Sequence, residues 1–386
     1  MLKNRHISFL TWLLSGMMLL MTVACSSSDE EGQEGGADKK PVMLAIYVYA
    51  PEQAAAAQKK AALRRADVGD VDAITIEGTI KSLQLWIYES TSGDYVGYFS
   101  TEDVASLNNG EGMTYQIPVS DDFASRRPSV DVYVQANVKA DNCGVGTLNE
   151  ETERDDLMTD AKIVKSKFGL SPLTTEVPTD GLPMAGKLTT QPVVGDAPAL
   201  RVGSMNAVST VQLTRAVSKL RFVFAQTKSE PQPTVSITSI KIIENMIPNV
   251  EYLFDPTQPL TYNQDAAELL SSTIDNIAAT TNPTDYIYFN QDAQDYETMI
   301  NGAGLTVHGP IYLRESDKRL TGTISYSIGD VPQEPVTFQM QQAGDFLRNH
   351  TWIVYAYYAG AGRLQVQSLY VKDWSGKETS HNFYNW

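Results

Sequence analysis

The sequence predicts an all-β protein built from two β-sandwich domains in tandem, with few short helices. Apolar and polar residues alternate over many short segments, and turn-forming residues separate those segments. Only residues 149–167 are charged and continuous enough for a helix. With 386 residues, 42% of them hydrophobic and 20% charged, the chain can bury a large core. Many short strands are typical of sandwiches, and we expect transthyretin-like or Greek-key topology.

The alternation is clearest in six segments. They are residues 83–87, 130–134, 220–224, 324–328, 336–340 and 352–356. Turn signals such as Asp180-Gly181 and Gly309-Pro310 lie between such segments. A loop rich in Pro, Gly and Thr covers 191–203, and a new run of strands starts at 211. We therefore expect a domain boundary near Asn206, with one sandwich over 66–205 and a second over 206–386.

Composition argues against several classes of function. The formal net charge is −16, whereas a nucleic-acid binder needs clustered Lys and Arg, so we expect no nucleic-acid partner. The chain has only two cysteines, Cys25 and Cys143, which excludes a disulfide framework. Its four histidines are scattered along the chain. We expect no metal site and no cofactor.

The sequence also lacks the motifs of a hydrolase, so we expect no catalytic residues. G-x-S-x-G and H-E-x-x-H are both absent, and Gly-Ala-Gly at 302–304 and at 360–362 is typical of turns. A pair of Asp or Glu residues of the kind that glycosidases use stays open, because 46 acidic residues offer many such pairs.

The first 24 residues are typical of a secretory signal peptide. Lys3 and Arg5 form a basic start, and residues 7–24 are uncharged and mostly apolar. Small residues then precede Cys25, as in a lipobox, although Thr22 departs from the larger apolar residue usual at its position. A polar, acidic tether follows at 26–36 and cannot bury itself. We interpret Cys25 as a lipidation site that attaches the precursor to a membrane; a permanent N-terminal anchor is the alternative.

Residues 42–49 predict a β-strand with two apolar faces, bracketed by Pro41 and Pro51. Alternation places one set of side chains on one face and a second set on the other. The first set is Val42, Leu44, Ile46 and Val48, and the second is Met43, Ala45, Tyr47 and Tyr49. A strand of this kind should be buried on both sides or very nearly so.

A basic linker follows the strand. Residues 54–65 have high helix propensity but no apolar stripe with which to dock, so we expect a solvated segment. Exposed segments with basic residues are where trypsin-like proteases cut, and Arg64-Arg65 is a natural target. The alternative is an ordinary charged loop.

Several local strings together resemble the fimbrillin family of Bacteroidales, the FimA-like major fimbrial subunits of type V pili. They are LPMAG (182–186), LTRAVSKL (213–220), IYLRE (311–315) and RNHTW (348–352), with YVQAN (133–137) and VKDW (371–374). Their order and approximate spacing span nearly the whole chain. Each string is weak alone, and together with the lipobox they are fairly specific.

This resemblance implies a lipoprotein precursor from which an arginine-specific or trypsin-like protease removes residues 25–65. Cleavage falls after Arg65, which makes Ala66 the new N-terminus, or alternatively after Arg64. The strand that is lost is 42–49, and its residues Val42, Leu44, Ile46 and Val48 share one face. The mature protein is then a stalk subunit that polymerises with copies of itself and other pilus subunits, in a cell-surface fimbria that serves adhesion and biofilm formation.

The resemblance also implies that the vacated groove accepts a C-terminal strand of a neighbouring subunit. That donor tail lies after Gly362, and its anchor residues are Leu369, Val371, Trp374, Phe383 and Trp386. Two alternatives stay open. One is a surface lipoprotein that binds glycan or host protein without polymerising, and the other is an anchor or tip subunit of the same pilus.

Overall fold

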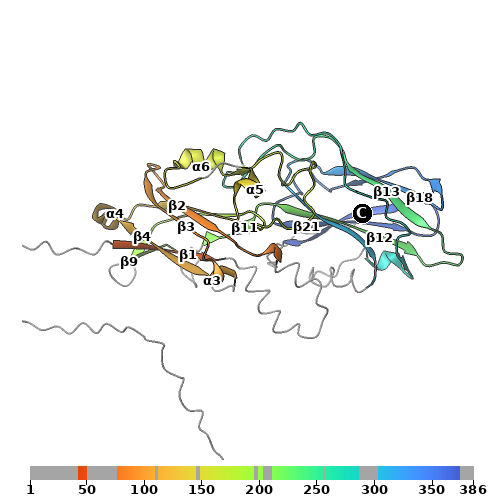
Figure 1. The fold of residues 1–386 in the computed structure, drawn as a ribbon, viewed down its shortest axis with the longest axis horizontal. Coiled ribbons are helices and arrows are strands. Elements are labelled where there is room, and N and C mark those ends of the chain that lie inside the picture. Colours follow the sequence, from red (N-terminus) through yellow and green to blue (C-terminus); the bar gives the residue numbers. More distant parts are fainter. Residues whose placement is uncertain are drawn as a thin grey trace, which may run out of the picture. The chain divides into compact units, whose positions relative to one another are not determined.

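The computed structural model describes residues 42–49, 76–108, 112–144, 148–194, 199–202, 211–255, 257–286 and 303–373. This part of the chain is mostly β-strand, so the predicted fold class is confirmed (Figure 1). The described helices are short. They are α3 (Ala105–Asn108), α4 (Asp121–Arg126), α5 (Ala140–Cys143), α6 (Arg154–Asp160) and the 3-10 helix η1 (Pro283–Tyr286).

The helix expected over 149–167 is much shorter than predicted. Only α6 is helical in this segment. Leu157 is the one residue of α6 that is buried, and the chain then continues into the short strand β6 (Lys162–Ile163). Ala161 and Ile163 are fully buried, so tertiary packing overrides the helix propensity of this charged segment.

Two sheets form the first sandwich. One holds β1 (Val42–Tyr49), β4 (Met113–Val119), β8 (Val193–Val194), β9 (Ala199–Val202) and β10 (Val211–Gln212). The other has the order β11 (Thr214–Arg215), β7 (Met184–Thr190), β5 (Val130–Ala136), β2 (Leu83–Glu89) and β3 (Tyr95–Thr101). Alternate residues of both sheets form one apolar core, which includes Ile46, Ile117, Leu85 and Val132.

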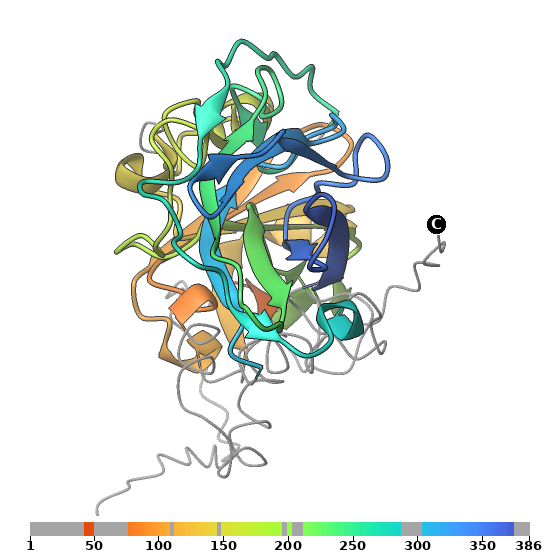
Figure 2. The ribbon, with the colours of Figure 1, turned by 90° about the vertical axis from the view of Figure 1, so that its right-hand side faces the viewer.

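Two further sheets form the second sandwich, which faces the viewer in Figure 2. One has the order β16 (Ala279–Thr280), β12 (Ser218–Thr227), β21 (His350–Tyr358) and β22 (Gln365–Asp373), with β17 (Thr306–Leu313) also on β12. The other has the order β15 (Ala267–Glu268), β13 (Val235–Ile242), β18 (Thr321–Ile328) and β19 (Val331–Pro332), with β20 (Val336–Gln339) also on β18. Their core includes Phe222, Ile240, Phe338 and Val354.

The two sandwiches contact each other through a pair of short strands and through apolar side chains. β14 (Glu251–Tyr252) pairs with β6, which brings residues 162–163 against residues 251–252. A third apolar cluster combines Trp86 and Leu157 with Leu253 and Tyr312. β10 and β11, which follow Asn206, pair with β1 and β7 of the first sandwich. The domain boundary near Asn206 stays a prediction.

Candidate functional site

The strand predicted at 42–49 is confirmed as β1, and it has hydrogen-bonded neighbours on both edges. β4 runs antiparallel to it over seven residue pairs, from Val42 opposite Val119 to Val48 opposite Met113. On the other edge β9 runs parallel to residues 43–46, and β10 runs parallel to residues 48–49. Removing β1 would therefore leave two facing rows of unpaired N–H and C=O groups, which is a template for another strand.

The inner face of β1 is part of the core of the first sandwich. Leu44, Ile46 and Val48 are each 0% exposed and pack among core residues of both sheets, and Val42 packs against the same cluster. Burying such a side chain contributes about 1.5–3 kcal/mol, so these three contribute on the order of 5–9 kcal/mol before ordering costs. The strand is held as firmly as a permanent core strand.

The outer face of β1 is only partly covered. Ala45 is 8% exposed, whereas Met43 and Tyr47 are half-buried. The expectation of near-complete burial thus holds for Leu44, Ile46 and Val48 on the inner face and for Ala45, whereas Val42 is half-buried. The side chain of Tyr49 lies outside the described residues.

Tyr47 fits a notch above Gly112. A Cβ atom on Gly112 would lie 2.1 Å from the Oη atom of Tyr47, and Gly112 has a φ angle of +74°. Both facts favour glycine, which alone combines an open left-handed region with no side chain. The absence of a side chain at Gly112 thus leaves room for the Tyr47 ring.

A buried ion pair holds the chain just after the segment predicted to be removed. Lys219 on β12 donates to both carboxylate oxygens of Glu77, at 3.2 and 3.0 Å, and Tyr312 on β17 donates to Oε1 at 2.5 Å. The Nε atom of Arg215 donates to the Glu77 carbonyl at 3.1 Å. Burial alone raises the pKa of Glu77, but the charges of Lys219 and Arg215 and the Tyr312 hydrogen bond outweigh it, so the pKa lies below its usual value.

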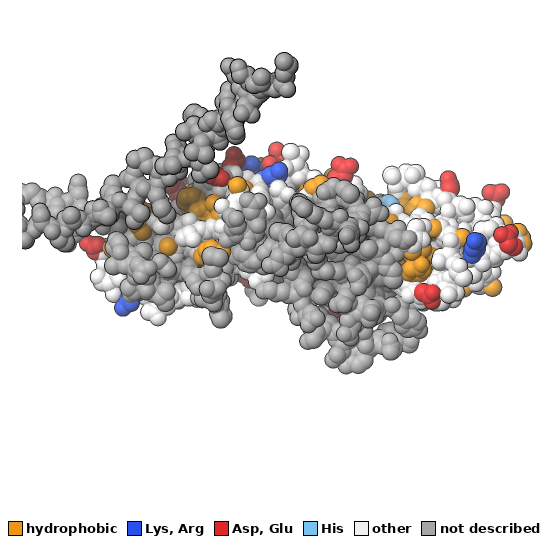
Figure 3. Space-filling model, turned by 90° about the horizontal axis from the view of Figure 1, so that it is seen from below, with side chains coloured by type: hydrophobic (Ala, Val, Ile, Leu, Met, Phe, Trp, Pro, Cys, Tyr) orange, Lys and Arg blue, Asp and Glu red, His pale blue; other side chains and the backbone are white. Residues whose placement is uncertain are grey.

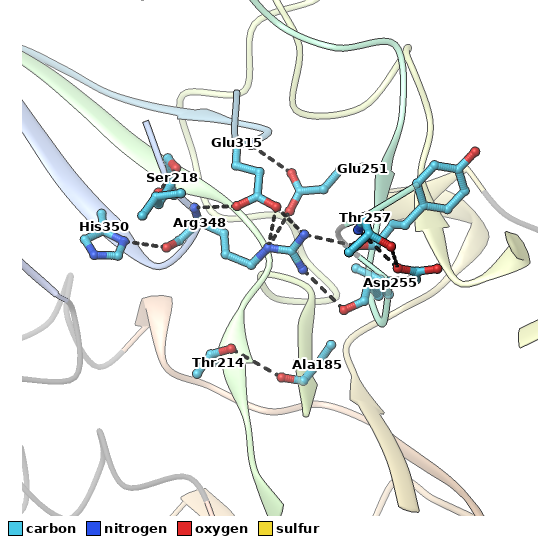
Figure 4. Close-up of polar contacts among 12 residues, drawn as sticks. Ala185, Thr214, Ser218, Glu251, Asp255, Thr257, Glu315, Arg348 and His350 are labelled. Atoms are coloured by element: carbon cyan, nitrogen blue, oxygen red, sulfur yellow. Dashed lines mark hydrogen bonds and ion pairs between the residues drawn. The ribbon is translucent and has the colours of Figure 1, made fainter. Parts of the chain in front are cut away.

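A second charge cluster, drawn in Figure 4, surrounds the half-buried Arg348 and includes the buried Glu251. Its guanidinium donates to Oε1 of Glu315 and to the carbonyls of Tyr252 and Leu253, and its Nε atom lies 3.2 Å from Oε1 of Glu251. Burial and the nearby Glu315 raise the pKa of Glu251 to about 8, although Arg348 opposes them. These contacts belong to the IYLRE and RNHTW strings, which therefore carry structural residues.

Of the other predicted site residues, the structure describes only Leu369 and Val371. Cys25, Arg64, Arg65 and Ala66, and the tail residues Trp374, Phe383 and Trp386, lie outside the described residues. Leu369 and Val371 lie in β22, opposite Ile353 and Thr351 of β21. The first part of the predicted donor tail thus pairs with the chain's own second sandwich, which the sequence alone did not indicate.

The described ranges also bear on metal binding and on membrane insertion. Within those ranges, no group of three or more His, Cys, Asp or Glu side chains is placed to hold a metal ion. No helix in the same ranges is long and apolar enough to cross a membrane. On the face seen in Figure 3, the described Lys and Arg side chains lie in small groups among acidic and neutral ones.

Comparisons with known proteins were made by sequence and by structure. No protein-family model matches the sequence, and no curated protein matches it. Similar solved structures include a putative cell adhesion protein from Parabacteroides distasonis, at 14% identity and a TM-score of 0.49, covering 86% of this chain and 97% of that one.

Two further similar structures are fimbrial proteins. One is the tip fimbrial protein Mfa3 from Porphyromonas gingivalis, with a C-terminal truncation, at 10% identity and a TM-score of 0.47, covering 86% of this chain and 99% of that one. The other is a fimbrial assembly protein from Parabacteroides distasonis, at 13% identity and a TM-score of 0.44, covering 86% and 96%. The three solved structures named here are thus one putative cell adhesion protein and two fimbrial proteins.

Proposed function

We propose that this protein is a structural stalk subunit of a cell-surface fimbria that serves adhesion and biofilm formation. Its precursor is exported as a lipoprotein, anchored to the outer membrane through Cys25, and cut by a trypsin-like or Arg-specific protease after Arg65. The cut subunit then polymerises with copies of itself and with other pilus subunits by strand exchange. The observation that carries the proposal is the position of β1, central in its sheet yet contributed by the segment before the basic linker.

The chain connectivity supports removal of β1. It ends at Tyr49, and the next described segment starts at Ile76, so a single cut at Arg64 or Arg65 falls between β1 and that segment. The first described segment after the cut stays fixed through the buried contacts of Glu77 with β12 and β17. The groove left behind has an apolar floor and two unpaired edges.

A strand from a neighbouring subunit would restore what β1 provided. It would complete the hydrogen-bond ladder with β4 on one edge and with β9 and β10 on the other. Four or five buried apolar side chains would contribute on the order of 6–15 kcal/mol before ordering costs. The donor is the tail after Gly362, with Leu369, Val371, Trp374, Phe383 and Trp386 as its anchors. Because tail and groove are different surfaces, the contact is head-to-tail and repeats into a filament.

Limited trypsin treatment of the purified precursor tests the proposal. We expect a discrete loss that ends at Arg64 or Arg65, identified by N-terminal sequencing, followed by ladders that resist SDS. The matched control is the variant Arg64→Ala/Arg65→Ala, which should stay uncut and monomeric under the same conditions. A cut chain that remains monomeric at every concentration would favour the non-polymerising binding protein instead.

A further inference from the structure

The slot that β1 fills makes a distinct demand at each of four successive positions. Ala45 is nearly buried on the outer face, Ile46 and Val48 are fully buried in the core, and Tyr47 fits the notch above Gly112. In chain order the slot therefore accepts a small residue, a branched aliphatic one, a tyrosine and a β-branched one. This order gives the slot a direction as well as a register.

The strand β22 contains the same order of residue types. Residues 368–371 read Ser-Leu-Tyr-Val, and residues 45–48 read Ala-Ile-Tyr-Val. We propose that β22 of a second copy fills the slot in the same direction as β1, with residues 368–371 in place of residues 45–48. Leu369 and Val371 then enter the core, and Tyr370 takes the notch above Gly112. This inference rests on the proposed function and adds the register and direction of the donor.

Other registers fit the slot less well. In a reversed strand with Leu369 at the Ile46 position, Tyr370 would take the position of Ala45, which has little space for it. Gln367 would then take the buried Val48 position. A forward shift by two residues places Asp373 in that same buried position. The chain end, with Phe383 at the Ile46 position, places Asn385 there. Each alternative places a polar or charged group at the fully buried Val48 position, which the proposed register fills with Val371.

The local structure of β22 suits release from its own sheet. Among the described strands, β22 ends the strand order of its sheet and pairs with β21, and Ser368 also donates to the Gln339 carbonyl at 3.0 Å. Departure of β22 thus breaks one described ladder and this hydrogen bond. The turn before it contains Gly360 and Gly362, with φ angles of +90° and +76° and open space around both. The backbone N–H of Leu364 donates to the hydroxyl of Tyr326 at 3.0 Å and fixes the start of the strand. The glycine turn is therefore a suitable hinge.

The same register explains why β1 must be removed first. Gln367 of the donor would take the position of Leu44, which is fully buried, and Gln365 would take that of Val42. β1 is thus the better occupant, and while it is attached it also has the advantage of a high effective concentration. A donor with two glutamines enters only after β1 has been cut from the chain and has dissociated.

Cysteine pairs placed across the expected contact test the register. Ala45 lies opposite Gln116 on β4, and Tyr47 lies opposite Thr114, so the pairs are Ser368→Cys with Gln116→Cys and Tyr370→Cys with Thr114→Cys. Directly opposed residues of antiparallel strands are close enough for a disulfide. The native Cys143 is fully buried, and Cys25 leaves with the propeptide. After trypsin treatment and oxidation, we expect crosslinked dimers and ladders on urea–SDS gels without reductant. Reductant should abolish these bands, and the uncut precursor should give none of them.

A matched variant, Asn382→Cys with Gln116→Cys, probes the chain end instead. If filaments form and only this pair crosslinks, the register is overturned while the proposed function stands. If no filament forms from the wild-type chain, both fail.

A measurement without cysteine variants uses a synthetic peptide of residues 365–373. It should slow ladder growth of the trypsin-cut wild-type chain at least tenfold at saturation, whereas the same peptide with Leu369→Asp should not. Equal effects of the two peptides, or none from either, would overturn the register.

Discussion

The Nζ atom of Lys219 lies 3.0 Å from the Oε2 atom of Glu77, and both side chains are 2% exposed. The two residues are 142 positions apart, so the ion pair connects the start of the first sandwich to a central strand of the second. Glu77 follows the predicted cleavage position by twelve residues. If the chain is cut there, the buried contacts of Glu77 would keep the segment that starts at Ile76 in place without β1.

Breaking this pair should destabilise the protein strongly. Glu77→Ala leaves Lys219 buried without its carboxylate partner, and removing one member of a buried pair costs about 3–5 kcal/mol. Urea unfolding of the full chain measures the loss. Glu77→Gln/Lys219→Met replaces both charges and should recover at least half of it. A loss below about 1 kcal/mol in Glu77→Ala would mean that the pair does not fix this junction.

Stability should depend on pH through Glu251. Its pKa rises to about 8 in the fold, mainly through burial, whereas the unfolded chain titrates near 4.5. Between these values the folded state binds more protons than the unfolded state, so the free energy of unfolding falls as pH rises from about 4.5 to 8. Glu251→Gln keeps an uncharged side chain and should lose this part of the slope. Urea titrations at pH 5, 6.5 and 8 compare the two proteins, and parallel profiles would contradict the expectation.

Glu77 has the opposite dependence. Its pKa lies below 4.5 in the fold, since Lys219, Arg215 and Tyr312 outweigh the effect of burial. The stabilisation is therefore complete above about pH 4.5 and is lost as pH falls through the lower folded value. Glu77→Gln should remove this acid-dependent loss in urea titrations between pH 5 and 3. A wild-type profile that matches the variant in this range would show that Glu77 contributes no linkage.

The notch above Gly112 gives a prediction with an internal control. Gly112→Ala combines a strained φ angle with a clash against Tyr47, whereas Gly360→Ala has a similar φ angle of +90° and open space around it. Both should lose about 1 kcal/mol from the backbone conformation. Gly112→Ala should lose about 1–3 kcal/mol more from overpacking, measured by thermal unfolding. Equal losses would mean that Tyr47 does not need the notch.

Local patterns predicted individual strands well. β1 was predictable because both of its faces are apolar and Pro41 and Pro51 bracket it. Alternation of apolar residues predicted four other strands, namely β2, β5, β12 and β21. Their partners were not predictable: β9 lies about 150 residues beyond β1, and no local signal sets such a pairing. The contact of Glu77 with Lys219 likewise joins distant residues. The resemblance marked Leu369 and Val371 as a tail but did not indicate their pairing with β21.

The last prediction concerns how tightly β1 holds its slot before the neighbour arrives. Leu44→Gln places an amide in the core at a fully buried position, which should weaken retention of β1 by about 2–4 kcal/mol. Ladders should then appear faster after trypsin treatment, because the cut strand dissociates sooner, while the cleavage rate itself stays the same. Met43→Gln is the matched control, since Met43 is a half-buried neighbour on the outer face and its change should alter the rate less than threefold. Quenched samples on SDS gels follow both rates, and an unchanged lag in Leu44→Gln would mean that dissociation of β1 does not limit assembly.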